Sequence, residues 1–182
     1  MTNPMKRMTV RTAETDSHST AKSKLKYNAS PVGGAFDNVR SSGKKNHQGW
    51  DLSAPGGTPV YAIGNGVVVS VQDKDQGDYG KSLQILLGDQ STSANQRLAF
   101  YAHLSAVFVK VGEMVSEGQL IARSGNSGNA KNTPPHLHLE IRTKANPGRG
   151  LKNRVDPGEV LGYEHYSCKL EDFGTADVCT AD

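Results

Sequence analysis

Apolar and polar residues alternate along the stretch "HLHLEIR", residues 136–142. Such alternation predicts a β-strand, because successive side chains of a strand point to opposite faces of its sheet. The apolar side chains would share one face and the polar ones the other, which sets Leu137, Leu139 and Ile141 against His136, His138 and Glu140. A histidine buried without partners costs free energy. The stretch is therefore either a half-exposed strand or the wall of a metal or catalytic site.

More strands are predicted upstream of this stretch. Residues 59–73, "PVYAIGNGVVVSVQD", indicate a short strand, a Gly-Asn-Gly turn and a second strand over 67–72. Residues 82–89 and 97–104 predict two further strands, and residues 106–128 predict short strands broken by glycines. No segment predicts an amphipathic helix longer than about three turns. The pattern, with 20 glycines and 8 prolines in the chain, predicts an all-β sheet or sandwich with little helix.

The two ends of the chain differ in composition from its middle. Residues 1–28 are polar and basic and lack the apolar region of a secretory signal peptide, so we expect a disordered arm that includes a solvated His18. Residues 29–163 would form the main domain, and residues 164–182 an acidic tail in which His165 is structural or solvated.

Cys168 and Cys179 are the two cysteines of the chain. We expect them to form a disulfide, which would add on the order of 3 kcal/mol by constraining the unfolded chain. Two free thiols are the alternative in a reducing compartment.

Charge and hydropathy exclude several classes of function. A net charge of +3 suits an anionic polymer as partner, but the basic residues form no stripe with aromatics, so nucleic-acid binding is disfavoured. No apolar run is long enough to span a membrane. The valines and glycines of "VKVGEMVSEGQLIA" suggest the barrel of a lipoyl or biotinyl carrier, but the turn "IGNGV" holds no lysine to carry the group.

Four histidines and one aspartate form a candidate constellation. "HQGWD" contains His47 and Asp51, His103 ends "FYAH", and His136 and His138 share the predicted strand. Hydrolytic zinc sites use three protein ligands and leave a fourth position for water, and imidazole with one carboxylate suits zinc. His47, Asp51 and His138 are the candidate metal ligands, which leaves His103 and His136 as acid–base groups. A purely structural histidine pair is the alternative.

Three ordered motifs carry a resemblance to a known family. They are "HQGWDLSAPGGTPVYA" at 47–62, "YAHL" at 101–104 and "PHLHLE" at 135–140, with "VGEMVSEGQLIARSGNSG" between the second and the third. Over about residues 31–157 the sequence resembles the lysostaphin-type zinc endopeptidases, which cut bacterial peptidoglycan. The resemblance implies an antiparallel β-sheet with a peptide-binding groove, one Zn²⁺ held by His47, Asp51 and His138, and catalytic roles for His103 and His136.

Two segments depart from the family pattern. The run "GNSGNAKNTPPHLH" is longer than usual and has Pro134 where the family has glycine, which points to an altered substrate preference. "FDNVR" keeps Phe36 and Arg40 of an F-G-x-R motif but not its glycine.

Three residues near the motifs have two interpretations each. Glu140 would either orient an imidazole or lie at the surface. Alternation along the strand places Tyr101 on the face of His103, where it would either donate to the transition state or pack half-buried. Trp50 would either line the groove or, as we expect, pack beneath the loop.

The resemblance implies hydrolysis of peptidoglycan stem peptides, and we expect cleavage of D-alanyl–diaminopimelate cross-links. Glycyl-glycine cleavage, a non-catalytic wall-binding or regulatory protein, and a phosphocarrier are the alternatives. Peptidoglycan lies in the periplasm or outside the cell, yet no signal peptide is visible. A removed leader, a phage lysin, or an antibacterial effector that has a secretion machine or a cognate inhibitor as partner would explain this.

Overall fold

The structure is a computed structural model that describes residues 1–11, 26–27, 30–41, 43–88, 96–163, 166–169 and 178–181. His18 and His165 therefore lie outside the described residues. Within these ranges, the helices found are too short to cross a membrane.

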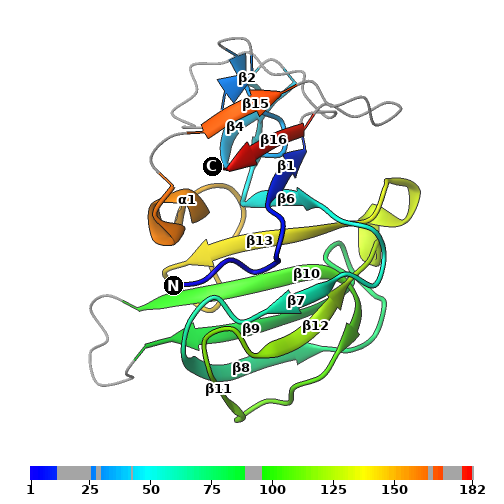
Figure 1. Cartoon of the computed structure of the whole chain (residues 1–182), viewed down its shortest axis with the longest axis vertical. Coiled ribbons are helices and arrows are strands. Elements are labelled where there is room, and N and C mark those ends of the chain that lie inside the picture. Colours follow the sequence, from blue (N-terminus) through cyan, green and yellow to red (C-terminus); the bar gives the residue numbers. More distant parts are fainter. Residues whose placement is uncertain are drawn as a thin grey trace.

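An antiparallel β-sheet dominates the fold, as the sequence predicts (Figure 1). Its strands run in the order β11 (Met114–Val115), β8 (Gly66–Gln72), β9 (Lys81–Leu87), β10 (Arg97–Val107), β13 (His136–Arg142), β6 (Trp50–Ser53), β1 (Thr9–Arg11), β16 (Val178–Ala181) and β15 (Tyr166–Lys169). Off this path, β12 (Leu120–Ser124) pairs with β10 and β7 (Pro59–Tyr61), and β14 (Arg154–Val155) pairs with β13.

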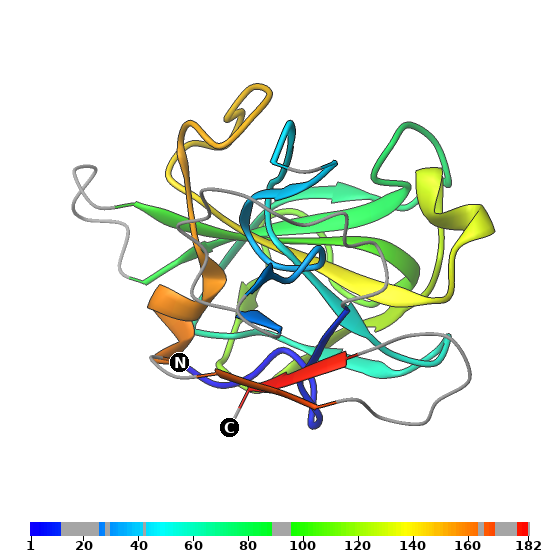
Figure 2. The ribbon, with the colours of Figure 1, turned by 90° about the horizontal axis from the view of Figure 1, so that it is seen from above.

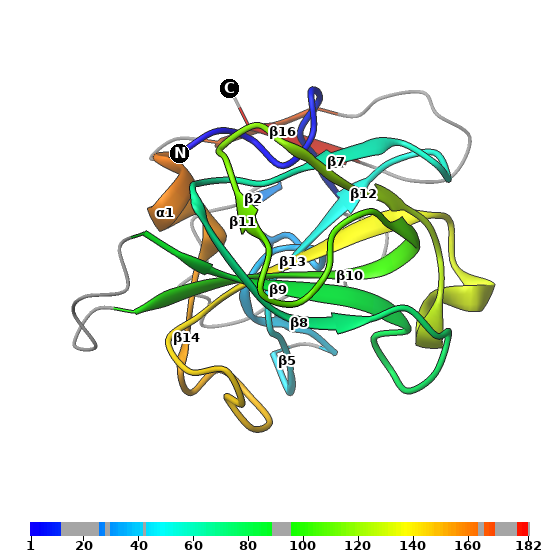
Figure 3. The ribbon, with the colours of Figure 1, turned by 90° about the horizontal axis from the view of Figure 1, so that it is seen from below.

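The smaller elements complete the domain. β4 (Asp37–Arg40) pairs with β5 (Lys45–His47), and β2 (Lys26–Tyr27) pairs with β3 (Ser30–Pro31). Among the described residues, the helices are the short α1 (Pro157–Leu161) and a 3₁₀ turn over Gly128–Asn132. The loops around β5 and after β13 extend to one side of the sheet, and β7 and β12 lie on the other (Figures 2 and 3).

The beginning of the chain belongs to the sheet, and the predicted disorder is wrong for residues 1–11. β1 pairs with β6 and β16, and Met5, Met8 and Val10 are buried. The polar composition of the whole segment hides these spaced apolar residues, whose burial holds the strand against the core. Residues 12–25 lie outside the described residues, so the domain limits stay a prediction.

The cysteines lie on neighbouring strands at the other end of the chain. The register of β15 and β16 sets Cys168 opposite Cys179. Residues directly opposite in an antiparallel pair have Cα atoms about 4.5–5.5 Å apart, which is within the range of a disulfide. The register therefore allows the disulfide, which stays a prediction.

The core lies on the face of β13 that carries its apolar residues. Leu137 pairs with Leu52, and Leu139 pairs with both Trp50 and Tyr101; all are fully buried. Trp50 thus packs in the core, as expected. Tyr101 is also part of the core, where its hydroxyl oxygen accepts a hydrogen bond from the backbone N–H of Ile63 at 3.0 Å, so it does not face the candidate site and the idea that it donates to a transition state is wrong.

A bulge in β10 explains why the alternation of side chains along a strand predicts the wrong face for Tyr101. His103 has a φ of 58°, and the pairing of β10 with β9 shifts register between Tyr101 and Leu104. Left-handed backbone at a non-glycine residue interrupts the alternation of a strand, and bulges redirect side chains in this way. The bulge lets Tyr101 face the core while His103 faces the other side of the sheet.

Gly49 sits between β5 and β6, against the backbone of β13. A Cβ atom added at Gly49 would lie 2.2 Å from the carbonyl oxygen of Leu139, whereas one at Gly56 would meet nothing closer than the Pro135 ring at 3.8 Å. We expect Gly49→Ala to lower the free energy of unfolding by about 1–3 kcal/mol, the cost of overpacking, and Gly56→Ala to lower it by much less. Denaturant unfolding measures both changes. Equal effects would contradict the close approach of Gly49 to the backbone of β13.

Candidate active site

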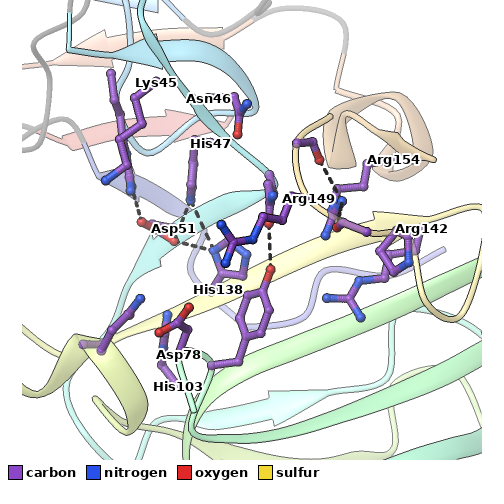
Figure 4. Close-up of a pocket in the computed structure, with 18 of the residues that line it drawn as sticks. Lys45, Asn46, His47, Asp51, Asp78, His103, His138, Arg142, Arg149 and Arg154 are labelled. Carbon is purple, nitrogen blue, oxygen red and sulfur yellow. Dashed lines mark hydrogen bonds and ion pairs between the residues drawn. The ribbon is translucent and has the colours of Figure 1, made fainter. Parts of the chain in front are cut away.

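Three side chains converge from three strands on the face opposite the core (Figure 4). The register of β13 and β6 sets His138 directly opposite Asp51. The β4–β5 hairpin, in which His47 pairs with Asp37, brings His47 to the same place. All three predicted ligand residues are buried and meet.

The atoms that converge have the spacing of a metal-ligand set. His138 Nδ1 lies 2.7 Å from Asp51 Oδ1, and His47 Nε2 lies 3.2 Å from both of these atoms. Ligands of a tetrahedral zinc ion, at 2.0–2.2 Å from the metal, lie roughly 3.3 Å from one another. The cluster is therefore compact enough to hold one such ion by three protein ligands.

Hydrogen bonds on the far side of each imidazole fix which ring nitrogen is free to bind. His47 Nδ1 donates to the carbonyl oxygen of Ala35 at 2.9 Å, so its Nε2 lone pair faces the cluster. His138 Nε2 lies 3.1 Å from Glu140 Oε1, a contact that directs the Nδ1 lone pair toward Asp51 and His47. Metal-binding histidines typically donate their other N–H to a carboxylate or carbonyl in this way.

Arg40 holds the carboxylate of Asp51. Its Nη2 donates to Asp51 Oδ2 at 2.6 Å and its Nε donates to the carbonyl oxygen of Gly33 at 2.8 Å. Burial raises the pKa of Asp51, but His47 and His138 outweigh this and place the pKa well below its usual range. Oδ1 thus stays an anionic ligand atom, and the missing glycine of the F-G-x-R motif does not displace Arg40.

Glu140 is fully buried beneath His138, so its predicted surface placement is wrong. Arg142 and Arg154 each donate an Nε–H to Glu140 Oε2 at 2.7 Å, and the hydroxyl of Tyr79 lies 2.7 Å from Oε1. Burial raises the pKa of Glu140, but His138 and Arg142 lower it to below its ordinary range. In turn, burial lowers the pKa of His138, but Asp51 and Glu140 outweigh it and raise the pKa to about 9, so a metal ion that binds Nδ1 has to displace a proton from it.

His103 and His136 face the cluster, as the sequence predicts. Their ring centroids lie 4.9 Å apart, and His136 Nε2 lies 3.7 Å from Asp51 Oδ1. Burial and the nearby His138 lower the pKa of His103 to about 4, and burial lowers the pKa of His136. Both imidazoles are therefore neutral near pH 7, the state in which one nitrogen donates and the other accepts a proton.

Several residues of the site have no signal in the sequence. Tyr79 follows a polar loop, and its ring centroid lies 5.7 Å from that of His138. Arg142 and Arg154 look like surface residues in the sequence, but they are buried against Glu140. The nearest available signal is the position of Arg142 at the end of the strand that holds Glu140; Arg154 begins β14, which pairs with that strand.

The cluster opens into a pocket of about 930 Å³. Asn129, Ala130 and Thr133 of the unusual loop line it, so this loop borders the site as expected. The exposed Lys44, Lys45 and Arg149 also line it and make this part of the rim basic. The structure shows a pocket at this place, and the long peptide groove stays an expectation.

A buried set of two histidines and one carboxylate, open on one side to a pocket, is typical of metal-dependent hydrolases. Residues 45–157 match the model of Peptidase family M23. This span is more than half of the chain, and the chain belongs to this family.

Individual relatives and solved structures agree with the family. The chain is 38% identical over 109 residues to "Peptidoglycan DD-endopeptidase ShyA" of Vibrio cholerae, an alignment that covers 60% of this chain and 23% of that protein. It is 38% identical over 100 residues to "Glycyl-glycine endopeptidase ALE-1" of Staphylococcus capitis, which covers 55% of this chain and 25% of the other. The chain thus spans about a quarter of the length of these curated relatives.

The catalytic domain of lysostaphin from Staphylococcus simulans has a similar fold. It is 30% identical with a TM-score of 0.56, and the match covers 71% of this chain and 89% of that domain.

Removal of the Glu140 charge tests the network beneath His138. We expect Glu140→Gln to lower the free energy of unfolding at pH 7 by roughly 3–5 kcal/mol, because two buried guanidinium groups lose their anionic partner. Glu159→Gln, at an exposed position of α1, should cost less than about 1 kcal/mol. Denaturant unfolding of chelator-treated protein measures both.

The difference in unfolding free energy between wild type and Glu140→Gln should depend on pH. Because the folded-state pKa of Glu140 is lowered, its stabilisation is fully present above the ordinary value of about 4.3 and is lost as the pH falls through the folded-state pKa. The stability difference between wild type and Glu140→Gln should therefore shrink in acid. A difference that stays constant down to about pH 2 would count against the charged network.

Proposed function

We propose that this protein is a zinc-dependent peptidoglycan endopeptidase that hydrolyses the D-alanyl–diaminopimelate cross-links of the bacterial cell wall. The observation that carries the proposal is the convergence of His47, Asp51 and His138 beside two neutral histidines in a member of family M23. Two imidazole nitrogens, one carboxylate oxygen and an open fourth side form a donor set that fits zinc.

Different residues of the site would hold the metal and transfer protons. Zinc, when bound, lowers the pKa of a water molecule toward about 7 and polarises the scissile carbonyl. His47, Asp51 and His138 would hold the ion. His103 and His136 lie where one can take a proton from the attacking water and the other can stabilise the developing oxyanion.

The positive charge on the rim of the pocket favours a substrate with free carboxylates. Lys44, Lys45 and Arg149 place three exposed cations around the site, against the exposed carboxylate of Asp78. Directly cross-linked stem peptides carry free carboxylates, whereas the interior of a polyglycine bridge carries no charge. Attraction between the rim and these carboxylates favours the D,D cross-link.

The names of the relatives include both the D,D-endopeptidase and the glycyl-glycine endopeptidase activity. ShyA is named a DD-endopeptidase and ALE-1 a glycyl-glycine endopeptidase, so glycyl-glycine cleavage is the second candidate. Either substrate places the action of this protein in the periplasm or outside the cell.

Digestion of defined substrates tests the proposal. We expect the protein to convert dimers from directly cross-linked peptidoglycan into monomers, as followed by chromatography and mass spectrometry. His103→Ala should slow this reaction on the order of 10²-fold or more, because it removes a proton-transfer group. Lys74→Ala, an exposed change away from the pocket, should retain the wild-type rate.

Each other outcome points to an alternative. Unchanged dimers together with rapid cleavage of pentaglycine would establish the glycyl-glycine branch. Loss of neither substrate by metal-loaded protein would indicate the non-catalytic wall-binding or regulatory alternative.

A further inference from the structure

Arg11 comes from outside the span that matches the family, yet it reaches the centre of the site. The family match begins at residue 45, whereas Arg11 ends strand β1. Its Nη1 lies 3.0 Å from His136 Nδ1, and both side chains are buried. A guanidinium in direct contact with an acid–base histidine affects the chemistry of that histidine.

The backbone around Arg11 fixes the position of its side chain. Val10 pairs with Leu52 and faces the core, so Arg11 projects from the opposite face of the sheet, where Asp51 lies. The N–H of Gly34 donates to the carbonyl oxygen of Arg11, and the carbonyl oxygen of Gly34 accepts from the N–H of Asp51, both at 2.8 Å. A Cβ at Gly34 would lie 2.3 Å from the Arg11 carbonyl oxygen, so this close approach requires glycine.

Two groups compete for the same nitrogen of His136. Besides Arg11 Nη1, the carbonyl oxygen of Pro134 lies 3.0 Å from Nδ1. A guanidinium only donates and a carbonyl only accepts, so a neutral imidazole can form one of these hydrogen bonds but not both. The bond from the charged donor is the stronger one, which favours Nδ1 as an acceptor and puts the proton on Nε2.

His103 has the opposite arrangement. Its Nδ1 lies 2.8 Å from the carbonyl oxygen of Ser127, which can only accept, so Nδ1 carries the proton and Nε2 is left with a lone pair. The two imidazoles thus offer different atoms to the pocket: His103 an acceptor and His136 an N–H donor.

We propose that Arg11 is a positioning residue that holds His136 with its proton on Nε2, so that His136 donates to the oxyanion and His103 acts as the general base. The assignment of roles rests on the proposed function. The tautomer itself does not, since it follows from the contacts that Arg11 and Pro134 make with His136.

Nuclear magnetic resonance tests the tautomer directly. In protein with ¹⁵N-labelled histidine rings, near pH 7, His136 should show a protonated Nε2 and an unprotonated Nδ1. Arg11→Met should move the proton to Nδ1, which then donates to Pro134. Arg11→Lys, which keeps a cationic donor, and Lys6→Met, which removes an exposed charge from the same segment, should keep the wild-type tautomer.

A protonated Nδ1 in the wild type, or the same tautomer in wild type and Arg11→Met, would overturn the proposal. If Arg11→Met does not fold, the spectrum of the wild type and that of Arg11→Lys still decide it.

Kinetics separate positioning from a merely structural role. Arg11→Met should lower kcat on the order of 10-fold to 10²-fold, up to the cost of one lost oxyanion donor, with little change in KM or in zinc content. Arg11→Lys should restore part of kcat. Equal losses in both variants, together with loss of zinc or of folded protein, would show a structural role instead. A wild type that cleaves no cross-link would refute the proposed function and leave the tautomer result standing.

Discussion

The register of β13 between β10 and β6 is the constraint on which the site depends. It sets His138 opposite both Asp51 and Ala102, and His136 opposite Ser53, while Leu137 and Leu139 fill the core on the other face. Because side chains alternate with a period of two, a slip of one residue would bury the histidines in the core and expose the leucines. The hydrophobic core therefore specifies the register, and the register assembles the candidate metal site.

Buried charge is the second requirement of the arrangement. Asp51 and Glu140 both lie away from solvent, and each is held by arginine: Arg40 on Asp51, and Arg142 with Arg154 on Glu140. A buried carboxylate is tolerated only with such partners. These arginines keep two anions beside His47 and His138, one as a ligand atom and one as the acceptor that orients an imidazole.

The sequence predicts the fold and the five central side chains because both follow from local patterns. Alternation in β13 gives the face of His136 and His138, and the motif spacing gives His47, Asp51 and His103. Alternation predicts the wrong face for Tyr101, because the bulge at His103 depends on the pairing of β10 with β9, which no local pattern encodes. Arg11 and Tyr79 were missed for a similar reason: their contacts join segments distant in sequence. Averaged composition also hid the apolar residues that place β1 in the sheet.

The convergence of His47, Asp51 and His138 points to a zinc site that is open to the pocket. Anomalous X-ray scattering at the zinc edge, on crystals of protein purified without added metal, tests it most directly. We expect one zinc ion per chain, bound by His47 Nε2, Asp51 Oδ1 and His138 Nδ1 at about 2.0–2.2 Å, with its remaining position facing His103 and His136. A zinc ion bound elsewhere, or one closed off by a fourth protein side chain such as His136, would contradict it.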